Sequence, residues 1–121
     1  MTGQQALGAY QKYVEAWKAI PDAQRKSILL EVFDENVEYL VPEYVGGASE
    51  AIKDMERFQK QYPGAHFEIE NVSTHHEVAL FKWVLILPDR KVTVKGHDCV
   101  RFSPAGKIVS LLTFGPSSPK L

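Results

Sequence analysis

Alternating apolar and polar residues fill the second half of the chain, and this pattern limits the fold more than any other feature. The alternation recurs in four segments, at residues 67–76, 80–87, 92–102 and 108–114. Successive side chains of a strand point to opposite faces, so each segment predicts a β-strand with one more apolar face. Turn residues separate the last three segments, so we expect these strands to form antiparallel hairpins.

Three segments in the first half carry the three- and four-residue spacing of amphipathic helices. The first segment begins with Thr2 and Gln5, which predict a capping box. The second is expected to be capped by Asp22 and followed by a turn at residues 34–36. The third follows Gly47. The first half of the chain is therefore expected to be mainly helical.

The order of these elements predicts an α+β fold. A short strand at residues 37–41, stopped by Pro42, separates the second and third helices. Helix, helix, strand and helix thus precede four strands, which indicates helices packed on one face of a bent antiparallel sheet. The face of the later strands that carries Phe67 and Trp83 is the more apolar one. We expect that face to meet the helices.

The composition narrows the class of protein. A length of 121 residues suits one domain, which we expect to span residues 1–115, with a flexible tail at residues 116–121. A net charge of −1 with no long run of one sign argues against nucleic acid or a membrane surface as partner. Cys99 is the only cysteine, which excludes an internal disulfide. With no signal-peptide pattern and no long apolar run, we expect a cytoplasmic protein.

Asp98 conflicts with the strand in which it lies. By alternation its side chain shares a face with Val94, Gly96, Val100 and Phe102, which is the apolar face of residues 92–102. A carboxylate on an apolar face is costly unless it is paired, hydrogen-bonded or protonated. Two hypotheses remain open, a carboxyl group that faces a ligand pocket and a buried structural polar network.

The adjacent histidines His75 and His76 are a poor pair of metal ligands. Neighbouring strand residues point to opposite faces, and no third ligand has suitable spacing, so we expect no metal site. By parity His75 shares the face of Phe67, from which it could enter a pocket as an acid or base. The alternative is a surface histidine at the end of a strand. His97 is expected on the face opposite Asp98.

The chain resembles the NTF2-like superfamily, in particular its SnoaL-like and ketosteroid-isomerase-like members. The resemblance runs from about residue 9 to residue 114. It is carried by residues 13–17, 30–37, 42, 47, 51–52, 63–64, 75–76, 81–83, 96–98 and 106–110. It implies a cone-shaped fold, in which a strongly curved sheet wraps a deep pocket and three helices close the other side. It also implies a homodimer formed through the outer face of the sheet.

The same resemblance suggests roles for particular residues. Ketosteroid isomerases of this fold use a tyrosine of the first helix and a neutral aspartic acid of a late strand as an oxyanion hole. By position these residues fall on Tyr13 and Asp98. Their catalytic base falls on Val41, which cannot accept a proton. His75 is then the candidate base, and dehydratases of this fold, which use tyrosines and histidines, would direct attention to Tyr39, His75 and His97.

Three functions follow as hypotheses. The first is an isomerase, cyclase or dehydratase that acts on a small hydrophobic ketone through an enolate-like intermediate, without a cofactor. The second is a non-catalytic ligand-binding or dimerisation module that has lost the base. The third is an epoxide hydrolase, which would need an inward arginine and a second aspartate that the pattern does not indicate. The residues expected to line the pocket are Trp17, Tyr39, Val41, Phe58, Phe67, Trp83, Val100 and Phe102.

Overall fold

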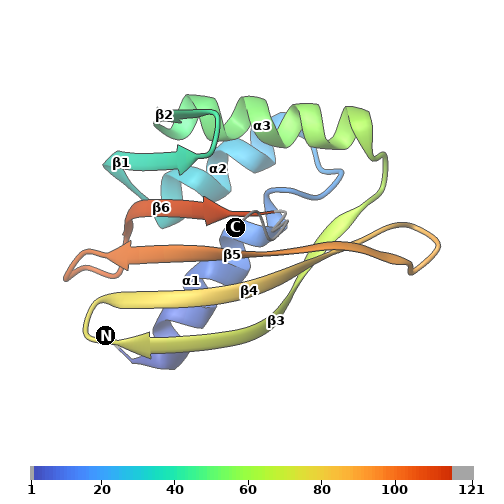
Figure 1. The fold of residues 1–121 in the computed structure, drawn as a ribbon. Helices are drawn as coiled ribbons and strands as arrows, with labels where there is room; N and C mark the ends of the chain where they lie inside the picture. The colour runs from blue at the N-terminus through green and yellow to red at the C-terminus, as the bar shows by residue number, and fades with distance from the viewer. Residues whose placement is uncertain (1, 116–121) are drawn as a thin grey trace.

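The computed structural model describes residues 2–115, which form three helices and six strands (Figure 1). The helices are α1 (Gly3–Glu15), α2 (Asp22–Val32) and α3 (Ala48–Gln61). The strands are β1 (Phe33–Val41), β2 (Tyr44–Gly46), β3 (His66–His75), β4 (Val78–Ile86), β5 (Val92–Phe102) and β6 (Ile108–Phe114). The α+β class is confirmed. The expected tail at residues 116–121 lies outside the described residues.

The strands form one curved sheet in the order β2-β1-β6-β5-β4-β3 (Figure 1). Four of the five pairs are antiparallel, but β1 and β6 run parallel. The expectation of a wholly antiparallel sheet is therefore wrong at this pair. A parallel pair needs a long connection, and here α3 and the four other strands separate its members along the chain. Figure 1 shows α1 crossing behind the sheet and α3 lying over the β1–β2 end.

The helix ends follow local chemistry. The predicted capping box of α1 is confirmed, since the Thr2 side chain accepts from the Gln5 amide and the Gln5 side chain accepts from the Thr2 amide. At the other end of α1, the buried guanidinium of Arg25 donates to the carbonyl oxygens of Ala16 and Lys18. This side chain satisfies carbonyls that the end of a helix leaves unpaired.

Two boundaries differ from the sequence-based expectation. The turn expected at residues 34–36 belongs to β1, where the pairing with β6 is irregular between Phe33 and Glu38. An irregular stretch of strand can carry the polar residues that otherwise indicate a turn. Asp22 does not cap α2 but is its first residue, after Pro21 at the cap position. The hairpin strand β2 was not anticipated.

An irregularity in β3 reverses the side-chain parity of its second half. Ile69 pairs with Trp83 and Asn71 pairs with Lys82, so one residue of β3 is unmatched between them. Beyond this bulge the alternation is shifted by one residue. Val72 then packs against the core, whereas His75 is exposed and lies opposite Val78.

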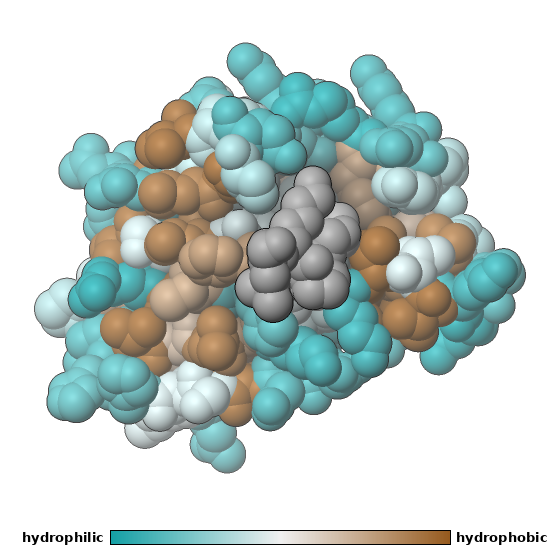
Figure 2. Space-filling view, viewed as in Figure 1, coloured by the Kyte–Doolittle hydropathy of each residue, from teal (hydrophilic) through white to brown (hydrophobic). Residues whose placement is uncertain are grey.

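The outer face of the sheet, on the side away from α1, carries exposed apolar side chains. Leu80 is 45% exposed and Phe114 is 54% exposed. Cys99 lies between Leu80 and Leu112 on the three neighbouring strands β4, β5 and β6. Figure 2 looks onto this face and shows hydrophobic residues in patches among polar ones. Within the described residues, no helix is long and apolar enough to cross a membrane.

Candidate functional site

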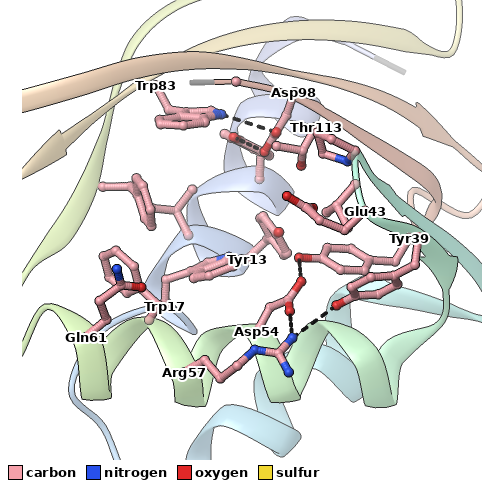
Figure 3. A pocket seen from close by; sticks show the side chains of 18 residues that line it. Tyr13, Trp17, Tyr39, Glu43, Asp54, Arg57, Gln61, Trp83, Asp98 and Thr113 are labelled. Carbon is pink, nitrogen blue, oxygen red and sulfur yellow. Dashed lines mark hydrogen bonds and ion pairs between the residues drawn. The ribbon is translucent and has the colours of Figure 1, made fainter. Parts of the chain in front are cut away.

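A cavity of about 620 Å³ lies between the sheet and the helices α1 and α3 (Figure 3). Its walls combine aromatic side chains with a small number of polar groups, which is the usual character of a small-molecule site. The lining residues are Tyr10, Tyr13, Val14, Trp17, Tyr39, Val41, Pro42, Glu43, Tyr44, Asp54, Arg57, Phe58, Gln61, Phe67, Trp83, Asp98, Thr113 and Gly115.

Asp98 supplies the buried carboxyl group of this cavity. It is 4% exposed, accepts a hydrogen bond of 2.6 Å from the Tyr10 hydroxyl on Oδ2, and accepts one of 3.2 Å from Trp83 Nε1 on Oδ1. Burial raises the pKa of Asp98 to about 6, although hydrogen bonds from Tyr10, Thr113 and Trp83 favour the charged form. The carboxyl group therefore exchanges its proton in mildly acidic solution rather than near pH 4.

The strand register and Gly96 position Tyr10 and Trp83, the two donors to Asp98. Phe81 lies opposite Asp98 in the β4–β5 pair, and the Tyr10 ring stacks on Phe81 with centroids 3.8 Å apart. Trp83 lies opposite Gly96, and a Cβ atom at position 96 would overlap the Trp83 ring. Only a glycine at position 96 lets the indole lie over the β5 backbone and reach the carboxyl group.

Tyr13 lies one helical turn after Tyr10 and also lines the cavity. The two rings are 5.6 Å apart. Burial, and then the charge of Asp98, raise the pKa of Tyr13 well above its ordinary value, so the phenol keeps its proton. The Tyr10 hydroxyl is bonded to Asp98 and the Tyr39 hydroxyl to Asp54, but the Tyr13 hydroxyl is bonded to neither carboxylate. It can therefore donate to a ligand.

A second polar group lies at the mouth of the cavity. The Tyr39 hydroxyl donates to Asp54 Oδ2 at 2.8 Å, and Arg57 forms an ion pair with Asp54 and donates to the Tyr44 hydroxyl. Burial raises the pKa of Tyr44 to about 12. The sequence pattern did not indicate an inward arginine or a second aspartate. Asp54 and Arg57 nevertheless line the cavity, because α3 turns part of its polar side toward it (Figure 3), although the Arg57 side chain stays 64% exposed.

The spacing of these residues was a signal that sequence analysis missed. Asp54, Arg57 and Gln61 recur at intervals of three and four, so they share one side of α3 with Phe58. A polar stripe of this kind is normally assigned to solvent. Glu43 was also missed, since it lies in the tight turn between β1 and β2 and belongs to no periodic pattern.

Most residues expected at the site do lie around one cavity. Its lining includes Tyr13, Trp17, Tyr39, Val41, Phe58, Phe67, Trp83 and Asp98. Val100 and Phe102 do not line it, although they share the face of Asp98. They lie further along β5 and are buried in the hydrophobic core, 0% and 3% exposed. The alternation of side chains along β5 predicted which face of the sheet they occupy, but not whether they reach the cavity or the core.

The expected inward position of His75 is wrong. The β3 bulge turns its side chain outward, where its Nδ1 lies 3.1 Å from that of His76. His97 faces away from Asp98, as parity predicted, because the pairing of β4 with β5 is regular at Gly96. Within residues 2–115, no three His, Cys, Asp or Glu side chains are grouped so that they could hold a metal ion.

A family model and a solved structure both relate this chain to the SnoaL-like family. The sequence model of the SnoaL-like domain matches residues 10–111. A solved structure of a proposed isomerase of the SnoaL-like family from Agrobacterium tumefaciens has a TM-score of 0.81 at 26% identity, covering 92% of this chain and 97% of that chain. No curated protein sequence matches this chain.

Two further solved structures share the fold. A proposed SnoaL-like polyketide cyclase from Jannaschia sp. CCS1 has a TM-score of 0.71 at 14% identity, covering 92% of this chain and 85% of that chain. AclR, a proposed hydroxylase from Streptomyces galilaeus, has a TM-score of 0.67 at 14% identity, covering 93% of this chain and 79% of that chain. At these identities the similarity shows the fold alone.

The raised pKa of Asp98 predicts a pH-dependent stability. A carboxyl group whose pKa rises from 3.8 to about 6 on folding stabilises the protein fully below pH 3.8, and this stabilisation is lost as the pH rises through about 6. Between pH 3.5 and pH 7.5 the free energy of unfolding of the wild type should therefore fall by about 3 kcal/mol relative to Asp98→Asn.

Urea unfolding of both proteins across this pH range measures the difference. Because the variant retains every other titratable group, the subtraction isolates Asp98. A difference that does not change with pH would contradict the assignment of a raised pKa to this carboxyl group.

Proposed function

Because the chain belongs to the SnoaL-like domain family, we propose that it is an enzyme that isomerises, cyclises or dehydrates a small hydrophobic ketone through an enolate-like intermediate. The observation that carries this proposal is the buried carboxyl group of Asp98 inside an aromatic cavity that Tyr13 also lines. The names of the Agrobacterium and Jannaschia proteins, a proposed isomerase and a proposed polyketide cyclase, agree with this class of reaction.

The aromatic walls suit a flat ligand. The Phe58 and Phe67 rings are stacked with centroids 4.7 Å apart, and Trp17 meets both edge-on at 5.7 and 5.5 Å. Rings in this arrangement bury a large apolar area. A ketone held against them would direct its oxygen toward the inner end of the cavity, where Tyr13 and Asp98 lie.

Tyr13 and Asp98 would act on the ketone oxygen. When a proton leaves the carbon beside the carbonyl group, negative charge develops on the oxygen, and two weakly acidic donors stabilise that charge. Asp98 donates in its protonated form, and a ligand that displaces water from the cavity raises the fraction protonated further. Tyr10 and Trp83 hold the carboxyl group in one orientation, so little reorganisation is needed during the reaction.

A binding module is the second candidate. The observation in its favour is Val41, which lines the cavity at the position where the resemblance leads us to expect a base. In that case the same aromatic walls would hold an apolar ligand without chemistry, since a fold does not determine a function.

We also propose that the chain forms a homodimer through the outer face of the sheet. Leu80 and Phe114 give this face an exposed apolar surface on the strands β4 and β6. Burying such side chains against a second copy removes apolar area from water. Sedimentation velocity at micromolar concentration should show a dimer, and Leu80→Lys should shift it toward monomer. A wild type that sediments only as a monomer would contradict the dimer.

The enolate proposal predicts catalysed exchange of the protons beside a ketone carbonyl group. In D₂O, 2-tetralone should take up deuterium faster with the protein than in buffer alone, as followed by ¹H NMR. Asp98→Ala should lower the catalysed rate by about 100-fold, the loss expected for one oxyanion-hole donor. Asp98→Asn should retain part of the rate, because an amide can still donate.

His75→Ala serves as the matched control, and its exchange rate should equal that of the wild type. Both tryptophans of the chain, Trp17 and Trp83, line the cavity, so quenching of their fluorescence reports ligand binding independently. A wild type that binds 2-tetralone without catalysing exchange would favour the binding module. An Asp98→Ala variant as fast as the wild type would remove the proposed role of Asp98.

A further inference from the structure

We infer that Glu43 is the base that removes the proton from the ketone, an inference that rests on the function proposed above. The reaction needs a proton acceptor, and the residues expected in that role do not supply one. Val41 has no basic group, and His75 lies outside the cavity. Three carboxylates line the cavity within the described residues, on Glu43, Asp54 and Asp98.

Two of these three carboxylates are already engaged. Asp98 accepts a hydrogen bond on each oxygen, from Tyr10 and from Trp83. Asp54 accepts from the Tyr39 hydroxyl on one oxygen and pairs with Arg57 through the other. A carboxylate that is bonded in this way is a weaker proton acceptor, because its charge is already stabilised.

The carboxylate of Glu43, unlike those of Asp54 and Asp98, has no hydrogen-bond partner in the described part of the chain. Among residues 2–115, no side chain or backbone group forms a hydrogen bond or an ion pair with its carboxylate. Figure 3 shows this carboxylate turned into the cavity, on the side of the β1–β2 turn, whereas Tyr13 projects from α1. A ketone between these walls would have its oxygen at Tyr13 and Asp98 and the neighbouring carbon open to Glu43.

The backbone fixes the position of Glu43. Val41 pairs directly with Tyr44, so Pro42 and Glu43 form the two-residue loop of a hairpin. The proline ring restricts the backbone before Glu43, and both flanking residues, Val41 and Tyr44, line the cavity as well. A base must lie at a defined distance from the proton it removes, and a short loop between paired strands holds it there better than a long one.

The proposed step needs no other reactant. The Glu43 carboxylate takes a proton from the carbon beside the carbonyl group, and the electrons of the broken C–H bond form a carbon–carbon double bond. The carbonyl π electrons move to the oxygen, which accepts hydrogen bonds from Tyr13 and Asp98. In a ketone with a carbon–carbon double bond next to that carbon, the charge extends to the far carbon of the double bond. Glu43 returns the proton to this far carbon as the carbonyl group re-forms, which completes an isomerisation and restores the carboxylate.

Exchange of 2-tetralone protons in D₂O tests this role of Glu43. Glu43→Gln removes the proton acceptor with little change in shape, so the catalysed rate should fall by about 100-fold or more. The dissociation constant of 2-tetralone, measured by quenching of Trp17 and Trp83, should change by less than about threefold. Glu43→Asp keeps a carboxylate and should retain more of the rate than Glu43→Gln.

Glu38→Gln is the matched control, because Glu38 is an exposed glutamate on the same hairpin that does not line the cavity. Its exchange rate should stay within about twofold of the wild type. Exchange by the wild type that survives Glu43→Gln overturns this inference alone and leaves the proposed function standing. A Glu43→Gln variant that loses ligand binding together with exchange assigns Glu43 to binding and also overturns it. Absence of exchange in the wild type overturns the proposed function itself.

Discussion

The hydrogen bond from Tyr10 to the buried carboxyl group of Asp98 joins the two layers of this protein at the point where its cavity ends. Tyr10 belongs to α1 and Asp98 to β5, so the bond ties the helical layer to the sheet, and Trp83 adds a second donor from β4. A buried carboxyl group without partners would cost several kcal/mol, so these donors are needed for Asp98 to be tolerated among apolar neighbours. The shape of the inner cavity depends on this arrangement.

Side-chain alternation revealed Asp98 as a misplaced carboxyl group, but it did not identify the partner. Tyr10 and Tyr13 lie one turn apart on the same side of α1, and the sequence does not specify how far the helix slides along the sheet. The resemblance to ketosteroid isomerases pointed to Tyr13, whereas the structure bonds Tyr10 to Asp98 and leaves Tyr13 facing the cavity. Tyr10 therefore holds the carboxyl group in place, and Tyr13 is the tyrosine that can meet a ligand.

Other errors have similar causes. Parity assigns a face and not a depth, so Val100 and Phe102 were expected in the pocket but lie in the core. One unmatched residue in β3 reversed the orientation of His75, and a single-residue bulge leaves no clear mark in the sequence. Asp54 was not singled out in the sequence, because its orientation toward the cavity depends on how α3 packs over the sheet. The fold itself was predicted, because helix spacing, alternation and turns all agree along the chain.

The site combines an aromatic middle with two polar ends that differ in character. The inner end holds a carboxyl group with a pKa of about 6 and the Tyr13 phenol, while the mouth holds the ion pair of Asp54 and Arg57. The Glu43 carboxylate projects into the cavity from the β1–β2 turn (Figure 3). In the proposed reaction Asp98 stabilises charge on the ketone oxygen and Glu43 accepts the proton of the neighbouring carbon, so both groups must face the same carbonyl group.

In the proposed complex the ligand oxygen lies between Tyr13 and Asp98. A crystal structure with bound 2-naphthol, a flat enol that resembles the enolate, measures this most directly. The naphthol oxygen should lie within about 3 Å of both the Tyr13 hydroxyl and one Asp98 carboxyl oxygen, with its rings against Phe58 and Phe67. A naphthol bound with its oxygen toward Arg57 at the mouth, away from Asp98, would contradict the account.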